Sequence, residues 1–275
     1  MRLTPFSTVL AVATTASLAF LLLPIVAIFA ELSPGDLRDG LTSEVTRDAL
    51  RVTIETNLVA MALIILFGTP TAYLLATRRF RGKALLVTLV ELPLVLPPAV
   101  AGIGLLAAFG RLGLLGGTLD GLGIDIAFTK VAVVLAITFV ASPFYVRTAI
   151  AAFEAVDPDL VAASRTLGAG PGRTFARVAL PLAGGGLGAG AALAFARGLG
   201  EFGATIMFAG SLQGVTQTLS LAVYQEFDVE FDNALAIGAL LVVASALILL
   251  TAKLVLAWRR SNSTLITASA RSVSS

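Results

Sequence analysis

Six long apolar runs, separated by short polar segments, constrain this sequence more than any other feature. A membrane-spanning helix needs about 20 consecutive apolar residues, and hydrocarbon offers no partner to an unpaired backbone N–H or C=O group. Each run is therefore predicted to cross a bilayer as a helix. The predicted spans are residues 8–30, 54–77, 85–109, 130–151, 184–208 and 234–258. The fold class is an all-α polytopic membrane protein with about six transmembrane helices.

The composition agrees with membrane insertion and excludes several kinds of function. Hydrophobic residues make up 57% of the chain and charged residues 13%, whereas a soluble domain carries about 25% charged residues. The chain has no Cys and no His, which excludes thiol chemistry, disulfides, Ser-His-Asp catalysis and His-ligated metals. We expect no catalytic residue and no bound metal. The net charge of +2 is too small to indicate a nucleic-acid partner.

The distribution of Lys and Arg predicts how the chain is oriented. With the N-terminus inside, 13 of the 19 basic residues fall in inside segments and 5 in outside segments, and Arg197 lies within a span. Because cytoplasmic loops are enriched in Lys and Arg, both termini are predicted to be cytoplasmic, with the protein in the plasma membrane. The first apolar run is longer than a signal-peptide core of about 7–15 residues, which favours a retained span over a cleaved signal peptide.

Three regions are predicted along the chain. Residues 1–49 hold the first span and an outer loop, residues 50–258 the core with an inside loop at 152–183, and residues 259–275 a disordered cytoplasmic tail rich in Ser and Thr.

The third predicted span contains three prolines and one acid. Pro93, Pro97 and Pro98 each lack a backbone donor, so a straight helix is excluded. Broken spans in transporters often line the substrate path, although a kink for packing would explain the same prolines. Glu91 lies a few residues inside the span, where a carboxylate is a candidate functional group or a partner for an arginine. Gly102 follows the break.

The fifth predicted span is interrupted by charge. Arg197 and Glu201 are four residues apart and therefore share one helix face. In a span of 184–208, Arg197 would lie just beyond the middle of the bilayer, where an isolated charge costs several kcal/mol. The two residues are predicted either to form a structural ion pair or to line an anion path. The candidate path residues are Glu91, Pro97, Pro98, Gly102, Arg197 and Glu201.

Residues 161–183 form a polar stretch between two apolar runs. It contains three arginines and no acid, and its many small residues predict a helix–turn–helix with little bulk on one face. Such a surface would let the backbone of another protein come close. An ordinary basic cytoplasmic loop would have the same charge.

This stretch resembles the cytoplasmic coupling motif of ABC-importer permeases, which reads Glu-Ala-Ala, three residues, Gly, nine residues, and Ile-x-Leu-Pro. Gly168 takes the glycine place, Val178 replaces the isoleucine, and Ala162 replaces the glutamate. The resemblance implies a type I importer fold in which this loop docks on a separate ATPase subunit. The implied docking residues are Ala162, Ala163, Ser164, Leu167, Gly168, Ala169 and Gly170, with Leu180 and Pro181.

A narrower resemblance covers residues 50–258. The proline-rich third span, the stretch Ala194–Ala204 containing GEFGA, and the stretch Thr216–Tyr224 are similar to molybdate and sulfate-type permeases, with Ser220 where a proline is common. The resemblance implies a homodimer in membrane lipid that works with an ABC ATPase and an extracytoplasmic oxyanion-binding protein. It implies that this chain binds no cofactor and that ATP and Mg belong to the ATPase.

Three classes of function stay open from the residues alone. The first is an importer permease for molybdate, or for sulfate, thiosulfate or tungstate. The second is a membrane-embedded lipid phosphotransferase, which lacks a catalytic constellation here. The third is a secondary transporter, for which no internal repeat is evident. The chain has no G-x-x-x-x-G-K-[ST] sequence, so an ATP-driven function needs a separate ATPase.

Overall fold

The structure is a computed structural model that describes the backbone of residues 5–272 and the side chains of residues 6–254. All regular elements in this part of the chain are helical. They are α1 Pro5–Glu31, α2 Pro34–Thr42, α3 Glu44–Thr77, α4 Lys83–Val95, α5 Pro98–Phe109, α6 Gly116–Gly121, α7 Lys130–Glu154, α8 Pro158–Thr166, α9 Pro171–Thr174, the π-helical turn η1 Phe175–Ala179, α10 Leu180–Leu199, α11 Gly203–Ala209, α12 Leu219–Glu226 and α13 Phe231–Ser272.

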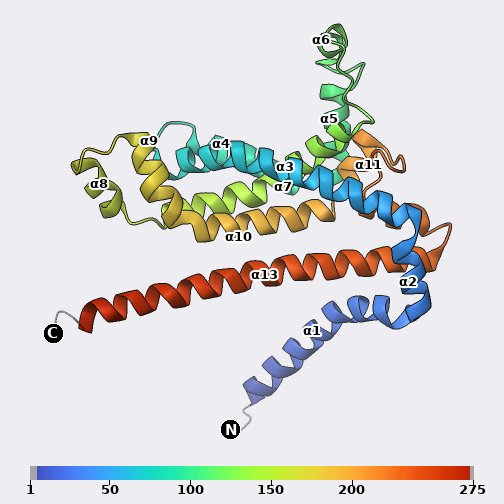
Figure 1. Cartoon of the computed structure of the whole chain (residues 1–275), viewed down its shortest axis with the longest axis horizontal. Coiled ribbons are helices and arrows are strands. Elements are labelled where there is room, and N and C mark those ends of the chain that lie inside the picture. Colours follow the sequence, from blue (N-terminus) through green and yellow to red (C-terminus); the bar gives the residue numbers. More distant parts are fainter. Residues whose placement is uncertain (1–4, 273–275) are drawn as a thin grey trace.

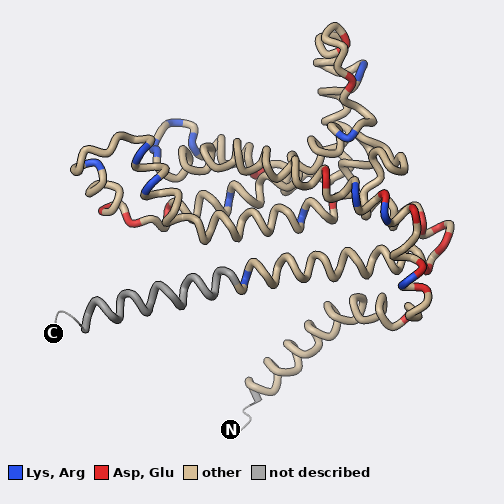
Figure 2. The backbone as a smooth tube through the Cα atoms, viewed as in Figure 1, with Lys and Arg blue, Asp and Glu red and all other residues tan. Residues whose placement is uncertain are grey.

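The axes of the long helices α3, α4, α7, α10 and α13 are roughly aligned, and α3, α7 and α10 form the centre (Figure 1). Helices α8 and α9 lie at one end of this bundle, and α2 and α11 lie at the other. Helices α5 and α6 project sideways. Figure 2 shows basic residues around α8, α9 and the α3–α4 turn, whereas most acidic residues lie at the opposite end near α2.

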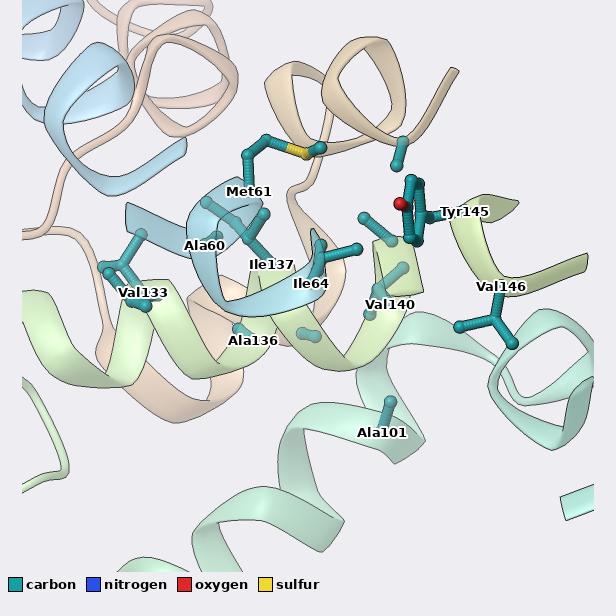
Figure 3. Close-up of a cluster of buried hydrophobic side chains, with 14 of the residues drawn as sticks. Ala60, Met61, Ile64, Ala101, Val133, Ala136, Ile137, Val140, Tyr145 and Val146 are labelled. Carbon is teal, nitrogen blue, oxygen red and sulfur yellow. The ribbon is translucent and has the colours of Figure 1, made fainter. Parts of the chain in front are cut away.

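The core between α3, α7 and α10 is built from small side chains. Ala60, Ala136 and Ala194, one from each helix, are completely buried, and larger side chains such as Ile64, Ile137 and Tyr145 fill the space around them (Figure 3). Lipid tails are as apolar as leucine, so spanning helices associate through close packing rather than through the hydrophobic effect. Small residues at the contacts provide that packing.

The predicted fold class and number of spans are confirmed. Among the described residues, five helices are long and apolar enough to cross a membrane, and α4 with α5 makes a sixth if the bent pair is counted as one span. The bend between α4 and α5 is 113°. Leu96 and Pro97 form the break, in extended backbone conformations.

The fifth span differs from its predicted limits of 184–208. The spanning segment begins at Pro171 and ends at Leu199, and residues 203–209 form the separate short helix α11. The chain breaks at Gly200, and the Glu201 side chain accepts a hydrogen bond from the backbone N–H of Ala204 in the first turn of α11. Arg197 therefore lies in the last turn of α10, near one end of the span rather than just beyond its middle.

Two boundaries also differ from the predicted regions. Helix α3 runs without interruption through residue 50, because residues 44–67 contain neither Gly nor Pro to end it. Helix α13 continues to Ser272, past the boundary predicted at residue 258, and the disorder expected of the tail stays a prediction. Residues 273–275 of that tail lie outside the described residues.

Helix α1 stands apart from the bundle. None of its most apolar 18-residue window is buried, and its neighbour within the chain is α13 (Figure 1). Its apolar surface, including Phe6, Leu10 and Phe20, is open along its whole length.

Two glycines of α10 provide a matched test of the close packing. A methyl group at Gly186 would collide with the Ala152 side chain of α7, whereas a methyl group at Gly188 would meet nothing within 4 Å. We expect Gly186→Ala to destabilise the protein by about 1–3 kcal/mol, as overpacking does. Gly188→Ala should be neutral or slightly stabilising, because Ala is the better helix former. Thermal unfolding of the purified protein measures both, and equal midpoints would contradict the packing argument.

Candidate coupling surface and transport path

Helix α8 forms an exposed elbow at one end of the bundle. Asp157 caps its start by accepting a hydrogen bond from the backbone N–H of Asp159 (2.9 Å), and Pro158 occupies the first position. Gly168 ends the elbow with φ of +82°, a left-handed conformation that a side chain would strain. The backbone N–H of Ala169 then returns to the carbonyl oxygen of Ser164 (3.0 Å).

The outer face of the elbow combines small residues with two exposed leucines. No residue of α8 is buried, and Ala162, Ala163 and Gly168 are all exposed. Leu167 is 88% exposed, and Leu160 is also open to the surroundings. Unburied leucines beside small residues form a surface that can pack against another protein. Leu167 is among the predicted docking residues and Leu160 is not, although their spacing of seven residues indicates that both lie on one helix face.

The other predicted docking residues have a different position. Ser164 is half-buried, and its hydroxyl lies 3.0 Å from the hydroxyl of the buried Thr174. Ser164 therefore attaches the elbow to the bundle. Ala169 is also half-buried, whereas Gly170 is exposed.

Leu180 and Pro181 follow the π-helical turn η1 rather than forming part of α8. The N–H of Leu180 donates to the carbonyl oxygen of Phe175, five residues earlier. A proline inside a helix lacks a donor and clashes with the preceding turn, and a π-helical turn is one way in which a helix absorbs such a residue. The Phe175 ring packs 4.7 Å from the Tyr73 ring, measured between centroids. Leu180 and Pro181 thus belong to the base of the elbow.

The break in the third span meets the start of α11. A Cβ atom at Gly102 would lie 2.5 Å from the carbonyl oxygen of Ala204, and one at Gly203 would lie 2.6 Å from Pro98. Only glycine allows the two helices to come this close. The structure therefore brings Pro98 and Gly102 together with the GEFGA stretch, although about 100 residues separate them in the sequence. Pro97 is exposed beside this contact.

Arg197 and Glu201 form an ion pair at the end of α10. Nη2 of Arg197 lies 2.7 Å from Oε2 of Glu201, and the exposed fractions of the two side chains are 27% and 1%. The second carboxylate oxygen accepts from the Ala204 N–H (2.7 Å), and the Ser220 hydroxyl donates to the Glu201 carbonyl oxygen (2.6 Å). Glu201 thus joins α10, α11 and the first turn of α12. Arg197 remains partly open beside it.

Glu91 is also paired. Its Oε1 lies 3.0 Å from Nε of Arg147 on α7, and both side chains are partly exposed. Glu91 and Arg197 belong to separate ion pairs, so the structure does not gather the predicted path residues into one cluster. Among the described residues, no group of three or more His, Cys, Asp or Glu side chains could hold a metal ion.

Sequence reasoning missed a polar patch on α3. Thr53, Thr56 and Asn57 are buried, although they lie at the start of an apolar run. The Thr53 hydroxyl accepts from the backbone N–H of Leu219 (2.8 Å), and Asn57 lies directly against Gly198. The spacing of three and four residues, which puts polar side chains on one helix face, could have indicated this contact.

The bundle of spanning helices, the exposed elbow at one end and the broken span near two ion pairs are features expected of a membrane transport subunit. Residues 64–260 match the family described as binding-protein-dependent transport system inner membrane component. The chain belongs to this family. It is a multi-pass inner-membrane protein with the fold of type I ABC importer permeases, and it is a transport subunit rather than an enzyme.

Individual relatives agree with this assignment. The chain is 45% identical over 235 residues to the molybdenum transport system permease protein ModB of Mycobacterium tuberculosis, covering 86% of this chain and 89% of the relative. It is 37% identical to the sulfate transport system permease protein CysT of Escherichia coli, covering 83% and 84%. A bacterial alginate ABC transporter, solved with a periplasmic protein, has a chain of the same fold with a TM-score of 0.71 at 16% identity, covering 90% and 92%.

The buried carboxylate at the end of α10 gives a stability prediction. Glu201→Gln keeps an acceptor for the Ala204 N–H but removes the charge opposite Arg197. We expect a loss of about 1–3 kcal/mol, the usual cost of leaving a buried polar group without its partner. The control is Asp120→Asn, which breaks the exposed Arg111–Asp120 pair (3.5 Å) and should cost less than about 1 kcal/mol. Unfolding in SDS titrations measures both, and a Glu201→Gln midpoint equal to that of the control would contradict the assignment.

Proposed function

We propose that this chain is the membrane subunit of an ATP-driven importer for a tetrahedral oxyanion, and that the oxyanion is molybdate. The observation that carries the substrate is the 45% identity to a molybdenum permease over most of both chains, against 37% to a sulfate permease. Sulfate is the second candidate, because it is also a tetrahedral dianion and the match to its permease covers a similar share of the chain. Thiosulfate and tungstate are anions of related shape.

The exposed elbow supports docking of a separate ATPase. The docking face consists of α8 with Leu167, Gly168 and Gly170, and Ser164 with Leu180 and Pro181 hold it on the bundle. ATP and Mg are bound by that ATPase, and this chain binds no cofactor. The remaining partners are an extracytoplasmic binding protein, a second copy of this chain and the surrounding lipid. Both termini are cytoplasmic, in agreement with the basic residues around α8 and α9 (Figure 2).

The transport path lies along α4, α5 and the end of α10. Pro97, Pro98 and Gly102 shape the break, and Arg197 offers a positive charge to a passing dianion. An unpaired arginine at low dielectric would hold a dianion too strongly for release. Glu201 offsets part of that charge at 2.7 Å, so the anion is attracted without being trapped. Glu91 lies in the inner half of the same path and is offset by Arg147.

Uptake of labelled molybdate tests the substrate. Cells with this gene disrupted should lose high-affinity uptake, and restoring the gene should recover it even with excess unlabelled sulfate, because the substrate is molybdate. If excess sulfate abolished the recovered uptake of molybdate, the proposed substrate would be sulfate instead. A restored strain that takes up neither labelled anion, with the protein present in the membrane, would refute the oxyanion assignment.

Gly168→Glu tests the docking face. The new side chain strains a left-handed residue and adds a charge to a small-residue surface, so we expect transport to fall about tenfold or more, equivalent to about 1.4 kcal/mol of docking free energy. Membrane insertion should be unchanged. Gly123→Glu, just after α6, is the matched control, because Gly123 also has a left-handed backbone (φ of +69°) with open space around it, and α6 lies far from the elbow. If the Gly168→Glu variant transported at the wild-type rate and still co-purified with the ATPase, docking at α8 would be contradicted.

A further inference from the structure

Two ion pairs join α4 to α7, and their polarities are opposite. Nζ of Lys83 lies 3.8 Å from Oε1 of Glu154, and Oε1 of Glu91 lies 3.0 Å from Nε of Arg147. Helix α4 supplies the cation of the first pair and the anion of the second. Lys83 and Glu91 are eight residues apart, roughly 12 Å, and Arg147 and Glu154 are seven apart, roughly 10 Å, at about 1.5 Å per residue. The two antiparallel helices therefore match in register.

The opposite polarity of the two pairs favours the observed register over slides of α4 by the distance between them. Sliding α4 by the distance between the pairs would place Lys83 beside Arg147 in one direction, or Glu91 beside Glu154 in the other. Both slides juxtapose like charges, which disfavours these two alternative registers. None of the residues of α4 is buried, although Val90 packs against the core. The ion pairs thus add to a limited apolar contact in holding α4 on α7.

The two ends of α4 have different attachments. At one end, Glu154 is the last residue of α7 and lies three residues before Asp157, which caps the elbow helix α8. At the other end, α4 stops at the Leu96–Pro97 break, beyond which Gly102 fixes α5 against α11. A displacement of α8 and the inner end of α7 would carry α4 along through the ion pairs. The break would then change its angle, because α5 is held.

We propose that the Lys83–Glu154 and Glu91–Arg147 pairs couple α4 to the elbow, so that movement of α8 changes the bend between α4 and α5. This inference rests on the proposed function, since it assumes that an ATPase moves α8. The four side chains are positioning residues. Glu91 thereby acts on the path by holding α4 in register, in addition to its place in the inner half.

The main test is a charge exchange, measured as anions transported per ATP hydrolysed by the complete transporter in vesicles. Glu91→Arg and Arg147→Glu alone should each lower that ratio at least about fivefold, the lower range of typical coupling free energies, while ATP hydrolysis continues. The double exchange restores an attractive pair in the same register and should recover the ratio. Asp120→Asn, which breaks an exposed pair in the α5–α6 projection, is the control and should change nothing.

The proposal would be overturned if the single variants transported as many anions per ATP as the wild type. It would also be overturned if the double exchange assembled normally but did not recover the wild-type ratio. Failure of the proposed function is distinguishable, because the unmodified transporter would then move no oxyanion at all. A second measurement remains valid in that case. The chain has no Cys, so spin labels can be placed on exposed Thr88 of α4 and Ala151 of α7 as the only cysteines.

The distance between these two labels should stay constant when ATP binds to the complex, because the pairs make α4 and α7 move together. In the Lys83→Gln, Glu91→Gln double variant, the distribution of distances between the two labels should become broader or should change when nucleotide binds. A distance that changes with nucleotide in the protein with all four charges would overturn the proposal.

Discussion

Close packing of small side chains is the constraint on which this structure depends. Helices in lipid gain little from hiding apolar surface, so they remain together where their backbones can approach closely. Buried alanines supply that approach between α3, α7 and α10, and glycines supply it where α5 meets α11. The close contact between α5 and α11 also shields the breaks in the helical backbone from lipid. The broken backbone at Pro97–Pro98 and the start of α11 lie against each other, where irregular backbone at membrane depth is tolerated.

The local features of the fold could be predicted from the sequence. Long apolar runs indicate spans because the requirement for internal hydrogen bonds acts within each segment. The prolines at 93, 97 and 98 indicate a broken helix, since the missing donors are a property of those residues alone. Asp157, Pro158 and Gly168 delimit α8 for equally local reasons, namely a cap, a first-turn proline and a left-handed end. The family resemblance rested on such local patterns, and the relatives agree with it.

Features that depend on distant partners could not be predicted in this way. The prolines do not determine the angle of 113°, because the contact between Gly102 and Ala204 helps to set it. The fifth span ends at Leu199 because Glu201 finds partners in Arg197, Ala204 and Ser220, and only the first of these was expected. Ser164 was expected on the docking face, yet its hydroxyl contacts the hydroxyl of the buried Thr174. In each case the missing information is the identity of a neighbour far along the chain.

The isolation of α1 affects the order in which the protein is built. Of the described spans, α1 is synthesised before the others, but it contacts α13, which is synthesised after them. During synthesis, α1 therefore lies in the bilayer without that contact until α13 has been made. The core of α3, α7 and α10 can assemble in the meantime, because its contacts do not involve α1. The contact between α1 and α13 consequently forms after the central core, so the docking of α1 is a late step in the assembly of the described helices.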